Sequence, residues 1–455
     1  MNICIIGTGY VGLVTGTCLA ELGHTVVCVD KVAHKVDSLK RNIMPIFEDG
    51  LADMVAENVE AGRLSFTTDL SQAMAQAKAV FIAVGTPSVE TKDGSPAAAD
   101  LSQVKAVAKE IAQTMTGYTV VINKSTVPVG TQKIVTDIIK GTNPTAAFDV
   151  VSNPEFLREG AAIGDFMNPD RIVVGQQTDK AAEIMQDLYK PLIDQGVAYL
   201  ETTPKTAELI KYAANALLAT KISFINEMAD ICEAADADVE ELAMGIGLDN
   251  RIGPKFLKPG PGFGGSCFPK DTDALVHIAQ QHGAPTHIVE SVVEANNARK
   301  ELMVKKIISA CGGAVEGKKI AILGLTFKAN TDDVRQSVSL VIVPALSRLG
   351  ADVRAYDPEG NETAAEIMPT VNYKDSAQDA LSGADVAVIL TEWPEFENLD
   401  WGNMKDIMAA PLLVDLRNIL DPIEMEKAGY TYISVGRHFQ GLNVDAPFLI
   451  KNLRA

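Results

Sequence analysis

A glycine-rich segment near the N-terminus limits the possible folds most strongly. It reads Gly7-Thr8-Gly9-Tyr10-Val11-Gly12, which is the pattern G-x-G-x-x-G. An apolar run at residues 2–6 precedes it, a helix-like run at 13–22 follows, and a second apolar run at 25–29 ends on Asp30. Such glycines permit a tight turn, close approach of the backbone to a pyrophosphate, and packing of the helix on the strand. The segment therefore predicts a βαβ unit that binds a dinucleotide.

Asp30 indicates which dinucleotide this unit accepts. An acidic residue at the end of the second strand accepts a hydrogen bond from the ribose 2′-hydroxyl, which favours NAD over NADP. The N-terminus of the intervening helix offers unpaired N–H groups to phosphate. A lone G-x-G-x-x-G is weak evidence, but here the strands, the helix and the acid all stand in the expected order. We therefore predict an NAD site.

Further apolar runs extend the same sheet. Residues 79–84, 119–122 and 149–152 have the length and apolar character of buried strands. The first two lead into loops that read Gly85-Thr86-Pro87 and Asn123-Lys124-Ser125-Thr126-Val127-Pro128. Open α/β sheets bind ligands at the carboxyl ends of their strands. Taken alone, each loop is more simply interpreted as an ordinary βα connection.

The α/β pattern of the first half returns after about residue 310. The segment that ends at Asp357 resembles the one that ends at Asp30. The other apolar runs of this second half lie at 319–323, 385–390 and 412–415. These similarities predict a degenerate internal repeat of a nucleotide-binding half. Because it lacks the three-glycine turn, it should not hold a dinucleotide, while Lys328 and Arg335 offer charge to a different phosphate ligand.

A long helical segment separates the two halves. From Lys205 to about Ala235, apolar residues recur at helical spacing, and a helix of this length links domains or lies at a dimer interface. Lys211 and Asn215 are four residues apart on another face, and a solvated side chain is the simplest interpretation of Lys211 alone. We expect an α/β chain of three domains. They are an N-terminal Rossmann NAD domain (1–200), a central helical linker domain (201–305) and a C-terminal Rossmann-like domain (306–455).

Three glycines surround a cysteine in the segment Gly262-Phe263-Gly264-Gly265-Ser266-Cys267-Phe268-Pro269-Lys270-Asp271. Glycine lets a backbone approach a ligand closely, and a neighbouring cation favours a thiolate. Cys267 is therefore a candidate covalent nucleophile, although a buried, inert cysteine in a glycine-rich turn remains an open alternative. Glu155 and Glu159 are four residues apart and would share a face if their segment were helical. Solvation is the simpler interpretation of both carboxylates.

Composition excludes several classes of partner. Lysine and arginine number 40 against 59 acidic residues, a net charge of −19, which argues against binding a nucleic-acid backbone. No apolar run reaches the length of about 20 residues that spans a bilayer. Glycines interrupt the apolar N-terminus, which argues against a signal peptide. The 6 cysteines are scattered without a metal-ligand spacing, so we expect no metal site, no disulfide framework and a reduced cytoplasmic location.

Five blocks in order give the chain a resemblance that runs nearly end to end. The chain resembles the nucleotide-sugar 6-dehydrogenases, the family of UDP-glucose and GDP-mannose dehydrogenases. The blocks are Gly7–Gly12, Lys124–Gly130, Asn153–Gly160, Gly264–Asp271 and Phe327-Lys328. One departure is Gln336-Ser337-Val338, where the family pattern leads us to expect Ser-Pro. This departure concerns the start of a helix rather than the chemistry.

The resemblance implies a fold, a reaction and an assembly. The family combines a Rossmann NAD domain, a helical linker that forms a dimer core and a second Rossmann-like domain for the UDP-sugar. Its members oxidise a primary alcohol to a carboxylate with two NAD⁺, through a thiohemiacetal and a thioester on the cysteine, here Cys267. Lys211 would stabilise oxyanion charge, and Asn215 would orient the same oxygen.

The remaining roles follow from the same resemblance. Glu155 would be the base for thioester hydrolysis, while Thr126 and Asp271 would hold the attacking water and tune Lys211. The residues expected at the NAD site are Gly7, Gly9, Tyr10, Val11, Gly12, Asp30, Lys35, Thr86, Thr126, Glu159, Lys270 and Arg335. The residues expected to contact the UDP-sugar are Glu155, Phe156, Leu157, Lys211, Asn215, Arg251, Phe256, Leu257, Lys258, Gly260, Gly264 and Lys328. In the family, the arginine at the position of Arg251 comes from the neighbouring subunit of a homodimer.

Several alternatives remain open at this point. UDP-glucose is the first expectation for the substrate, and sibling families oxidise GDP-mannose or UDP-N-acetylmannosamine. A non-catalytic NAD(H)-sensing protein would not need a thiol, a lysine and an acid together. A one-step hydroxyacid or polyol dehydrogenase would form one NADH per substrate and would not use Cys267.

Overall fold

The computed structural model describes residues 1–89 and 98–437. The chain forms two compact units. The first comprises Met1–Ala214 and Asp273–Pro285, and the second comprises Asn215–Thr272 and Thr286–Ala455. The predicted domain boundaries at residues 200 and 305 stay predictions.

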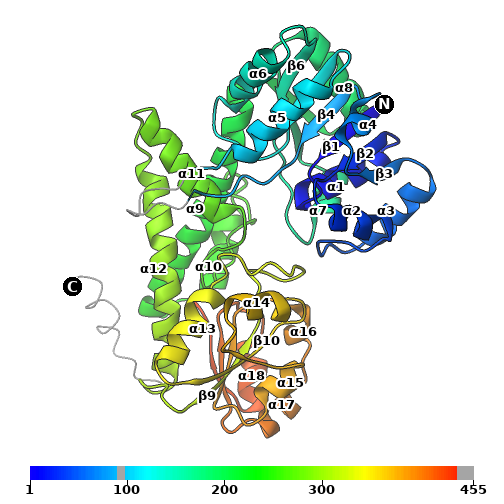
Figure 1. Cartoon of the computed structure of the whole chain (residues 1–455). Coiled ribbons are helices and arrows are strands. Elements are labelled where there is room, and N and C mark those ends of the chain that lie inside the picture. Colours follow the sequence, from blue (N-terminus) through cyan, green and yellow to red (C-terminus); the bar gives the residue numbers. More distant parts are fainter. Residues whose placement is uncertain (90–97, 438–455) are drawn as a thin grey trace. The chain divides into compact units, whose positions relative to one another are not determined.

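The first unit is built on an eight-stranded sheet with the order β3-β2-β1-β4-β5-β6-β7-β8 (Figure 1). Neighbouring strands are parallel except for β6 and β7, which are antiparallel. The strands are β1 (Asn2–Ile6), β2 (Thr25–Val29), β3 (Leu64–Thr67), β4 (Ala79–Ile82), β5 (Thr119–Asn123), β6 (Phe148–Ser152), β7 (Arg171–Gly175) and β8 (Ala198–Thr202). The order of the first six is that of a Rossmann fold.

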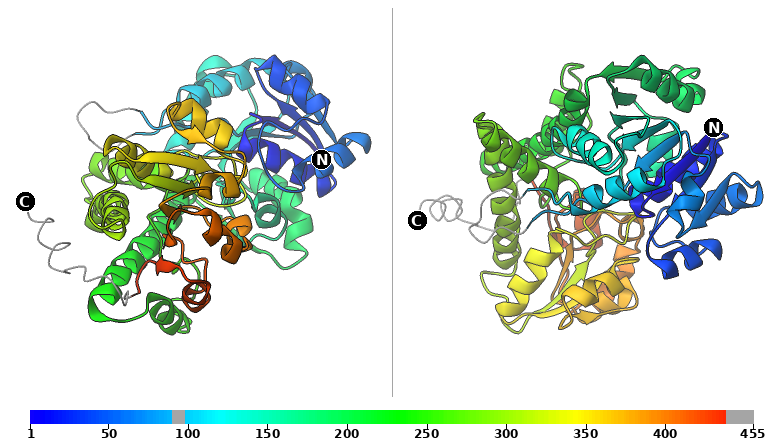
Figure 2. Two further views of the ribbon diagram at one scale, coloured as in Figure 1. Left: turned by 90° about the horizontal axis from the view of Figure 1, so that it is seen from below. Right: turned by 45° about the horizontal axis from the view of Figure 1, so that its top comes forward.

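Helices cover both faces of this sheet (Figures 1 and 2). They are α1 (Tyr10–Glu21), α2 (Ala33–Lys40), α3 (Leu51–Glu60), α4 (Leu70–Met74), α5 (Ser102–Thr114), α6 (Thr131–Thr142), α7 (Ala162–Met167) and α8 (Asp179–Ile193). Successive side chains of a strand point to opposite faces. Accordingly, Ile3 and Ile5 of β1 enter the core that α1, α3, α7 and α8 cover, while Cys4 and Ile6 enter the core under α4, α5 and α6.

The second unit contains a parallel six-stranded sheet with the order β11-β10-β9-β12-β13-β14. Its strands are β9 (Lys319–Leu323), β10 (Asp352–Tyr356), β11 (Asn372–Tyr373), β12 (Val386–Ile389), β13 (Leu412–Asp415) and β14 (Thr431–Ile433). Strand for strand, this order repeats β3-β2-β1-β4-β5-β6 of the first unit. The predicted internal repeat is thereby confirmed.

The other helices lie in the second unit or connect the two units. Those of the second unit are α10 (Val239–Gly247), α12 (His287–Ala310), α13 (Ser339–Arg348), α14 (Asn361–Ile367), α15 (Ala377–Leu381), α16 (Pro394–Glu397), α17 (Trp401–Ile407) and α18 (Pro422–Ala428). The predicted long helix is α9 (Pro204–Ala235), with 32 residues. Both α9 and α11 (Phe268–Gln281) have residues in each unit, so these helices carry the chain from one unit into the other.

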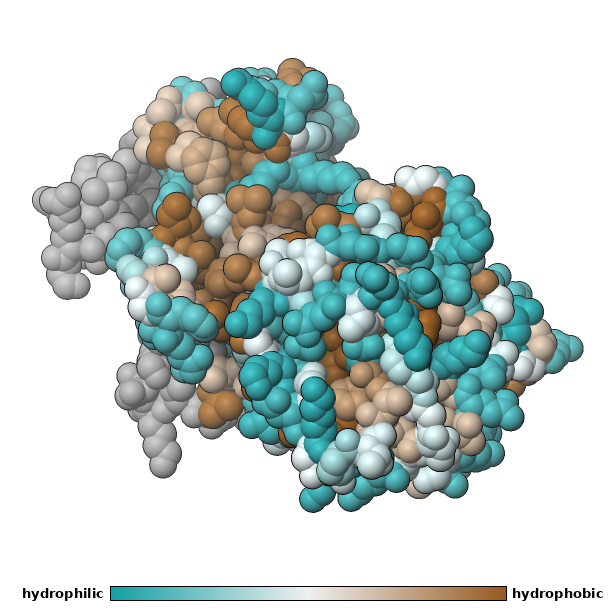
Figure 3. All heavy atoms as spheres, turned by 90° about the horizontal axis from the view of Figure 1, so that it is seen from above, coloured by the Kyte–Doolittle hydropathy of each residue, from teal (hydrophilic) through white to brown (hydrophobic). Residues whose placement is uncertain are grey.

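The surface combines charged and apolar side chains. One face carries hydrophilic side chains with clusters of hydrophobic ones between them (Figure 3). Within residues 1–89 and 98–437, no helix has both the length and the apolar content that crossing a membrane requires.

Candidate active site

The glycine turn between β1 and α1 has the shape that a pyrophosphate requires. Gly7 has φ +104°, and a Cβ at Gly12 would lie 1.9 Å from the carbonyl oxygen of Gly7, so both positions need glycine. A Cβ at Gly9 would meet nothing within 4 Å. The backbone at Gly9 is therefore open on one side, directly before the N-terminus of α1 at Tyr10. This open backbone at a helix start fits the phosphates of a dinucleotide.

Asp30 is held in its ionised form at the end of β2. Thr8 donates two hydrogen bonds to its Oδ2, from N at 3.1 Å and from Oγ1 at 2.7 Å, and Val32 N donates to Oδ1 at 3.0 Å. Burial acts to raise the pKa of Asp30, but these hydrogen bonds and the charge of Lys35 together hold it below the ordinary value. An ionised acceptor in this place suits a ribose hydroxyl.

Two further loops at the carboxyl edge of the sheet are tied together. Thr86, after β4, donates its hydroxyl to the carbonyl oxygen of Thr126, after β5, at 2.8 Å. Both residues were expected at the NAD site, and the structure brings their loops into contact. Parallel strands β4 and β5 are direct neighbours, so their following loops meet at the same edge.

Tyr10 is linked to the loop that carries Glu159 through a buried carboxylate. Its hydroxyl donates to Glu48, which is 8% exposed. The carboxylate of Glu48 also accepts from Gly160 N at 2.7 Å and from Ala162 N at 2.6 Å, at the start of α7. Burial and the neighbouring Glu48 raise the pKa of Tyr10 far above its usual value. Nothing in the sequence pattern singled out Glu48, because Gly160 and Ala162, two of its partners, lie more than 100 residues away along the chain.

Glu155 and Lys211 form a buried ion pair in the first unit. Lys211 Nζ of α9 lies 3.0 Å from Glu155 Oε1, and the two side chains are 3% and 5% exposed. Leu157 N donates to the other carboxylate oxygen. The expectation of solvated side chains at Lys211 and Glu155 is therefore wrong. The segment 153–158 is not helical, so Glu155 and Glu159 do not share a helix face.

Cys267 lies at the N-terminus of α11 in the second unit. Its carbonyl oxygen accepts from Asp271 N at 2.9 Å, which closes the first turn of the helix. The thiol is partly exposed, whereas Cys4, Cys18, Cys28 and Cys232 are buried. Burial raises the pKa of Cys4 and of Cys18 to about 12, so these thiols are unreactive at neutral pH. The N-terminus of a helix stabilises an anion, which suits a nucleophilic thiolate at Cys267.

The first turn of α11 also positions two charged side chains beside α9. Asp271 is 1% exposed, accepts from Asn215 Nδ2 at 2.6 Å and pairs with Lys270 Nζ at 2.7 Å. Asn215 is fixed by this contact, and it lies one helical turn after Lys211 along α9. The structure thus joins three of the predicted residues, Asn215, Lys270 and Asp271, in one cluster.

The loop before Cys267 packs tightly on the segment around residues 327–336. A Cβ at Gly264 would lie 2.4 Å from the carbonyl oxygen of Gln336, and one at Gly265 would lie 2.7 Å from the ring of Phe327. Gly265 N donates to the carbonyl of Arg335 at 2.9 Å. Only glycine permits this approach. The contact brings the cysteine loop next to the backbone of the segment that carries Lys328 and Arg335.

Two asparagines that the sequence did not single out fix the rest of this loop. Asn296 accepts from Phe263 N at 2.8 Å and donates to its carbonyl at 3.1 Å. Asn226 accepts from Gly260 N at 2.8 Å. Both asparagines are buried, at 4% exposure each, and both lie on long helices. Their side chains satisfy backbone N–H and C=O groups of a loop that belongs to no helix or strand.

The other predicted substrate residues differ in exposure. Leu257 is buried, whereas Arg251 and Lys258 are exposed. Arg251 forms bidentate bonds with Asp249 two residues away. Phe256 has φ +64°, an uncommon conformation for a side chain of this size. Phe156 lies in the first unit, where the guanidinium of Arg171 stacks on its ring at 3.7 Å.

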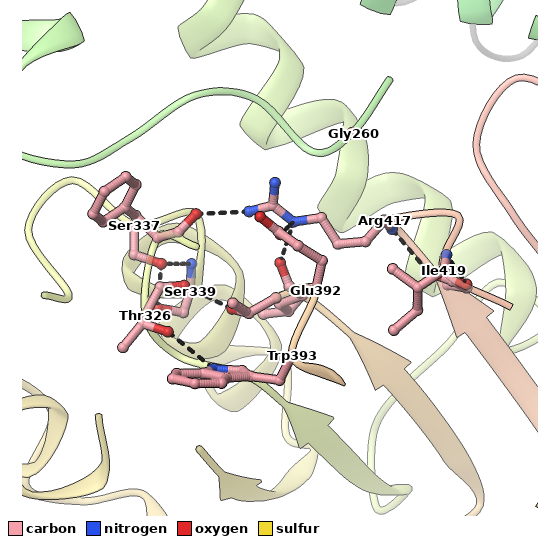
Figure 4. A network of polar contacts seen from close by, with 12 residues as sticks. Gly260, Thr326, Ser337, Ser339, Glu392, Trp393, Arg417 and Ile419 are labelled. Carbon is pink, nitrogen blue, oxygen red and sulfur yellow. Dashed lines mark hydrogen bonds and ion pairs between the residues drawn. The ribbon is translucent and has the colours of Figure 1, made fainter. Parts of the chain in front are cut away.

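A polar network at the carboxyl edge of the second sheet surrounds Arg417 (Figure 4). Its guanidinium donates to the carbonyls of Leu390 at 2.6 Å and Phe327 at 2.9 Å and pairs with Glu392 at 3.1 Å. Trp393 Nε1 donates to Thr326 Oγ1 at 3.2 Å. Trp393 is 6% exposed and packs in a hydrophobic core, so its role is structural.

Comparison with known proteins accounts for this combination of two Rossmann-like units and a helical linker. Residues 1–193 match the NAD binding domain of the UDP-glucose/GDP-mannose dehydrogenase family, residues 205–298 match its central domain, and residues 321–422 match its UDP binding domain. The fold and these matches define an NAD-dependent dehydrogenase. The chain belongs to the UDP-glucose/GDP-mannose dehydrogenase family, and its cofactor is NAD.

Individual relatives cover nearly the whole chain. The UDP-glucose 6-dehydrogenase of Rhizobium meliloti (strain 1021) is 54% identical over 439 residues, which are 96% of this chain and 100% of that protein. UDP-glucose 6-dehydrogenase TuaD of Bacillus subtilis (strain 168) is 49% identical, with 96% and 93% covered. Among solved structures, a UDP-glucose dehydrogenase from the hyperthermophilic archaeon Pyrobaculum islandicum has a TM-score of 0.87 at 36% identity and covers 96% of this chain and 97% of its own.

Proposed function

We propose that this protein oxidises UDP-glucose to UDP-glucuronate and consumes two NAD⁺ for each sugar. The observation that carries the proposal is the partly exposed thiol of Cys267 at the start of α11, next to the Asn215–Asp271 cluster. The names of the relatives at 54% and 49% identity support UDP-glucose as the substrate. GDP-mannose and UDP-N-acetylmannosamine are the second choices, because sibling enzymes share the same core motif.

The residue types explain why one site performs two oxidations. Bound NAD⁺ accepts the hydride that the sugar carbon releases in each of them. The first oxidation leaves an aldehyde, whose carbonyl carbon bears no hydroxyl group and therefore cannot release a second hydride as an alcohol carbon does. Addition of Cys267 Sγ to that carbon, with protonation of the oxygen, restores a hydroxyl as a thiohemiacetal. Loss of a hydride and a proton then gives a thioester, and water cleaves its C–S bond to release the carboxylate and the thiol.

Three buried groups perform the charge stabilisation and proton transfer in this scheme. The ammonium of Lys211 balances negative charge on the sugar oxygen, and the amide of Asn215, fixed by Asp271, donates a hydrogen bond to the same oxygen. Glu155 accepts a proton from the water that attacks the thioester. Thr126 and Asp271 hold this water and tune Lys211. In the resting protein Glu155 is paired with Lys211 Nζ at 3.0 Å.

We further propose that the protein is a cytoplasmic homodimer joined along α9. Leu217, Phe224 and Ile231 repeat at seven-residue spacing on this helix and are 64%, 46% and 56% exposed. A helical stripe of this kind is typical of a helix that packs against another copy. In this assembly, Arg251 would reach the sugar nucleotide of the neighbouring subunit.

Counting NADH tests the function directly. With UDP-glucose limiting, the proposal predicts two NADH per sugar and UDP-glucuronate as the product, and one NADH per sugar would contradict it. The variant Cys267→Ser should lose turnover to the acid but still bind UDP-glucose. Its matched control is Cys311→Ser, a second partly exposed cysteine, which should keep full activity. A panel with GDP-mannose and UDP-N-acetylmannosamine separates the sibling substrates.

A further inference from the structure

Lys124 is a buried lysine that the mechanism above does not use. It follows β5 directly and is 5% exposed. Its Nζ donates to Asn153 Oδ1 at 3.2 Å and lies 5.9 Å from the centre of the Phe166 ring. Burying an ammonium group costs free energy unless a nearby group of opposite charge or a hydrogen-bond acceptor compensates for the lost water. A group of opposite charge near Lys124 would account for its burial.

The neighbourhood of Lys124 includes the base of the proposed hydrolysis. Lys124, Asn153 and Glu155 line the same small cavity of about 40 Å³. The charge of Glu155 raises the pKa of Lys124, and the charge of Lys211 lowers it, so both charges interact electrostatically with Lys124. Burial is the largest effect, and the pKa of Lys124 falls to about 8, which leaves the side chain mainly protonated at neutral pH.

The other groups around this cavity do not supply a competing charge to Glu155. Tyr189 donates its hydroxyl to Asn153 Oδ1 at 2.6 Å, and burial raises its pKa, so it stays neutral. Asp165 is paired with Arg158 at 2.6 Å. Arg171 stacks on the ring of Phe156. The described charges that act on Lys124 are therefore those of Glu155 and Lys211.

Lys211 has two different partners in the proposed reaction. In the resting protein its ammonium pairs with Glu155 at 3.0 Å. During the reaction the same ammonium is proposed to balance charge on the sugar oxygen. Glu155 is 5% exposed, and burial disfavours the charged form of a carboxylate that has no cation beside it. A protonated Glu155 is no longer a base.

We propose that Lys124 is a positioning residue that keeps Glu155 ionised while Lys211 stabilises the oxygen of the sugar. This inference rests on the proposed roles of Glu155 and Cys267 in thioester hydrolysis. Lys211 and Lys124 then have separate functions: Lys211 acts on the substrate, and Lys124 acts on the base. If Lys124 had a purely structural role and only donated a hydrogen bond to Asn153, its positive charge would not be required.

Two substitutions separate charge from structure. Lys124→Gln keeps a donor for Asn153 but removes the charge, and Lys124→Arg keeps the charge. In Lys124→Gln the acid limb of the pH profile of kcat should move to higher pH, because the carboxylate loses a neighbouring opposite charge. The thioester should accumulate on the protein at pH 6.5, while the burst of the first NADH stays as in the unmodified enzyme. Lys124→Arg should restore the original acid limb.

The outcome that overturns the inference is an unchanged acid limb and no thioester in Lys124→Gln. If that variant does not fold, Lys124→Met is measured in the same way. A loss of activity with equal effects on the NADH burst and on hydrolysis would also overturn it, because a structural role predicts that pattern. Glu155→Gln keeps the two proposals distinguishable. Should it accumulate no thioester either, the role of Glu155 itself fails. Should it accumulate thioester while Lys124→Gln behaves as the unmodified enzyme, only the role of Lys124 fails.

Discussion

Replacement of Glu48 by alanine should release the segment around residue 160 and weaken the NAD site. The carboxylate accepts from Gly160 N, Ala162 N and the hydroxyl of Tyr10. Ala162 is fully buried, so its N–H would lose its partner without gaining water, at a cost of about 1–3 kcal/mol. Gly160 is half-buried and adds a smaller amount. We expect a total of about 3 kcal/mol, or roughly a 100-fold larger population of the open segment.

Hydrogen–deuterium exchange measures this opening locally, which suits a chain of two units better than a single unfolding transition. Peptides that cover residues 157–163 should exchange roughly 100-fold faster in Glu48→Ala. The NAD dissociation constant should rise several-fold, because the Tyr10 hydroxyl loses the carboxylate to which it donates, and the UDP-glucose dissociation constant should not change. Glu57→Ala is the matched control, an exposed glutamate on the neighbouring helix α3. Unchanged exchange in Glu48→Ala would refute the reasoning.

Three further changes have expected outcomes. Gly264→Ala should abolish turnover and lower the melting temperature, because its Cβ would lie 2.4 Å from a carbonyl oxygen of the facing loop. The control Gly141→Ala, with open space around it, should leave the melting temperature unchanged or raise it. Equal effects of the two substitutions would contradict this prediction. Burial lowers the pKa of His24 below its unfolded value, so the folded state loses stability as the pH falls below about 6.5. The melting temperature of His24→Gln should therefore depend less on pH between 7.5 and 5.5 than that of the unmodified protein. An identical pH dependence in the two proteins would argue against this role of His24. Leu217→Glu combined with Phe224→Glu should give a monomer in analytical ultracentrifugation, and an intact dimer would exclude α9 as the interface.

The apolar pattern predicts most of the central strands, and the reason is physical. Strands β1, β4 and β5 are buried on both faces, so they are continuous apolar runs in the sequence. The pattern does not single out β3 or β8. Both lie at the edges of the sheet and expose side chains, so neither is a continuous apolar run: β3 exposes Ser65, and β8 exposes Ala198, Leu200 and Glu201.

The site is predictable from motifs only in part. The glycines and Asp30 are recognisable because their spacing follows from the turn itself. The burial of Lys211 and Glu155 is not, since the ion pair joins a loop to a helix 56 residues further along the chain. Glu48 carries no local signal, and the motif that contains Lys124 does not reveal which side chains surround it. Their partners are set by the packing of the sheet, so these contacts become visible only with the structure.

Intact-mass measurement of Glu155→Gln during turnover with UDP-glucose and NAD⁺ tests the central claim most directly. The account predicts a protein that carries the mass of a UDP-glucuronyl group, that loses it on treatment with hydroxylamine, and that shows no such adduct when Cys267 is also replaced by serine. A variant that turns over or stalls with only unmodified protein, or an adduct that persists without Cys267, would contradict a thioester on this sulfur.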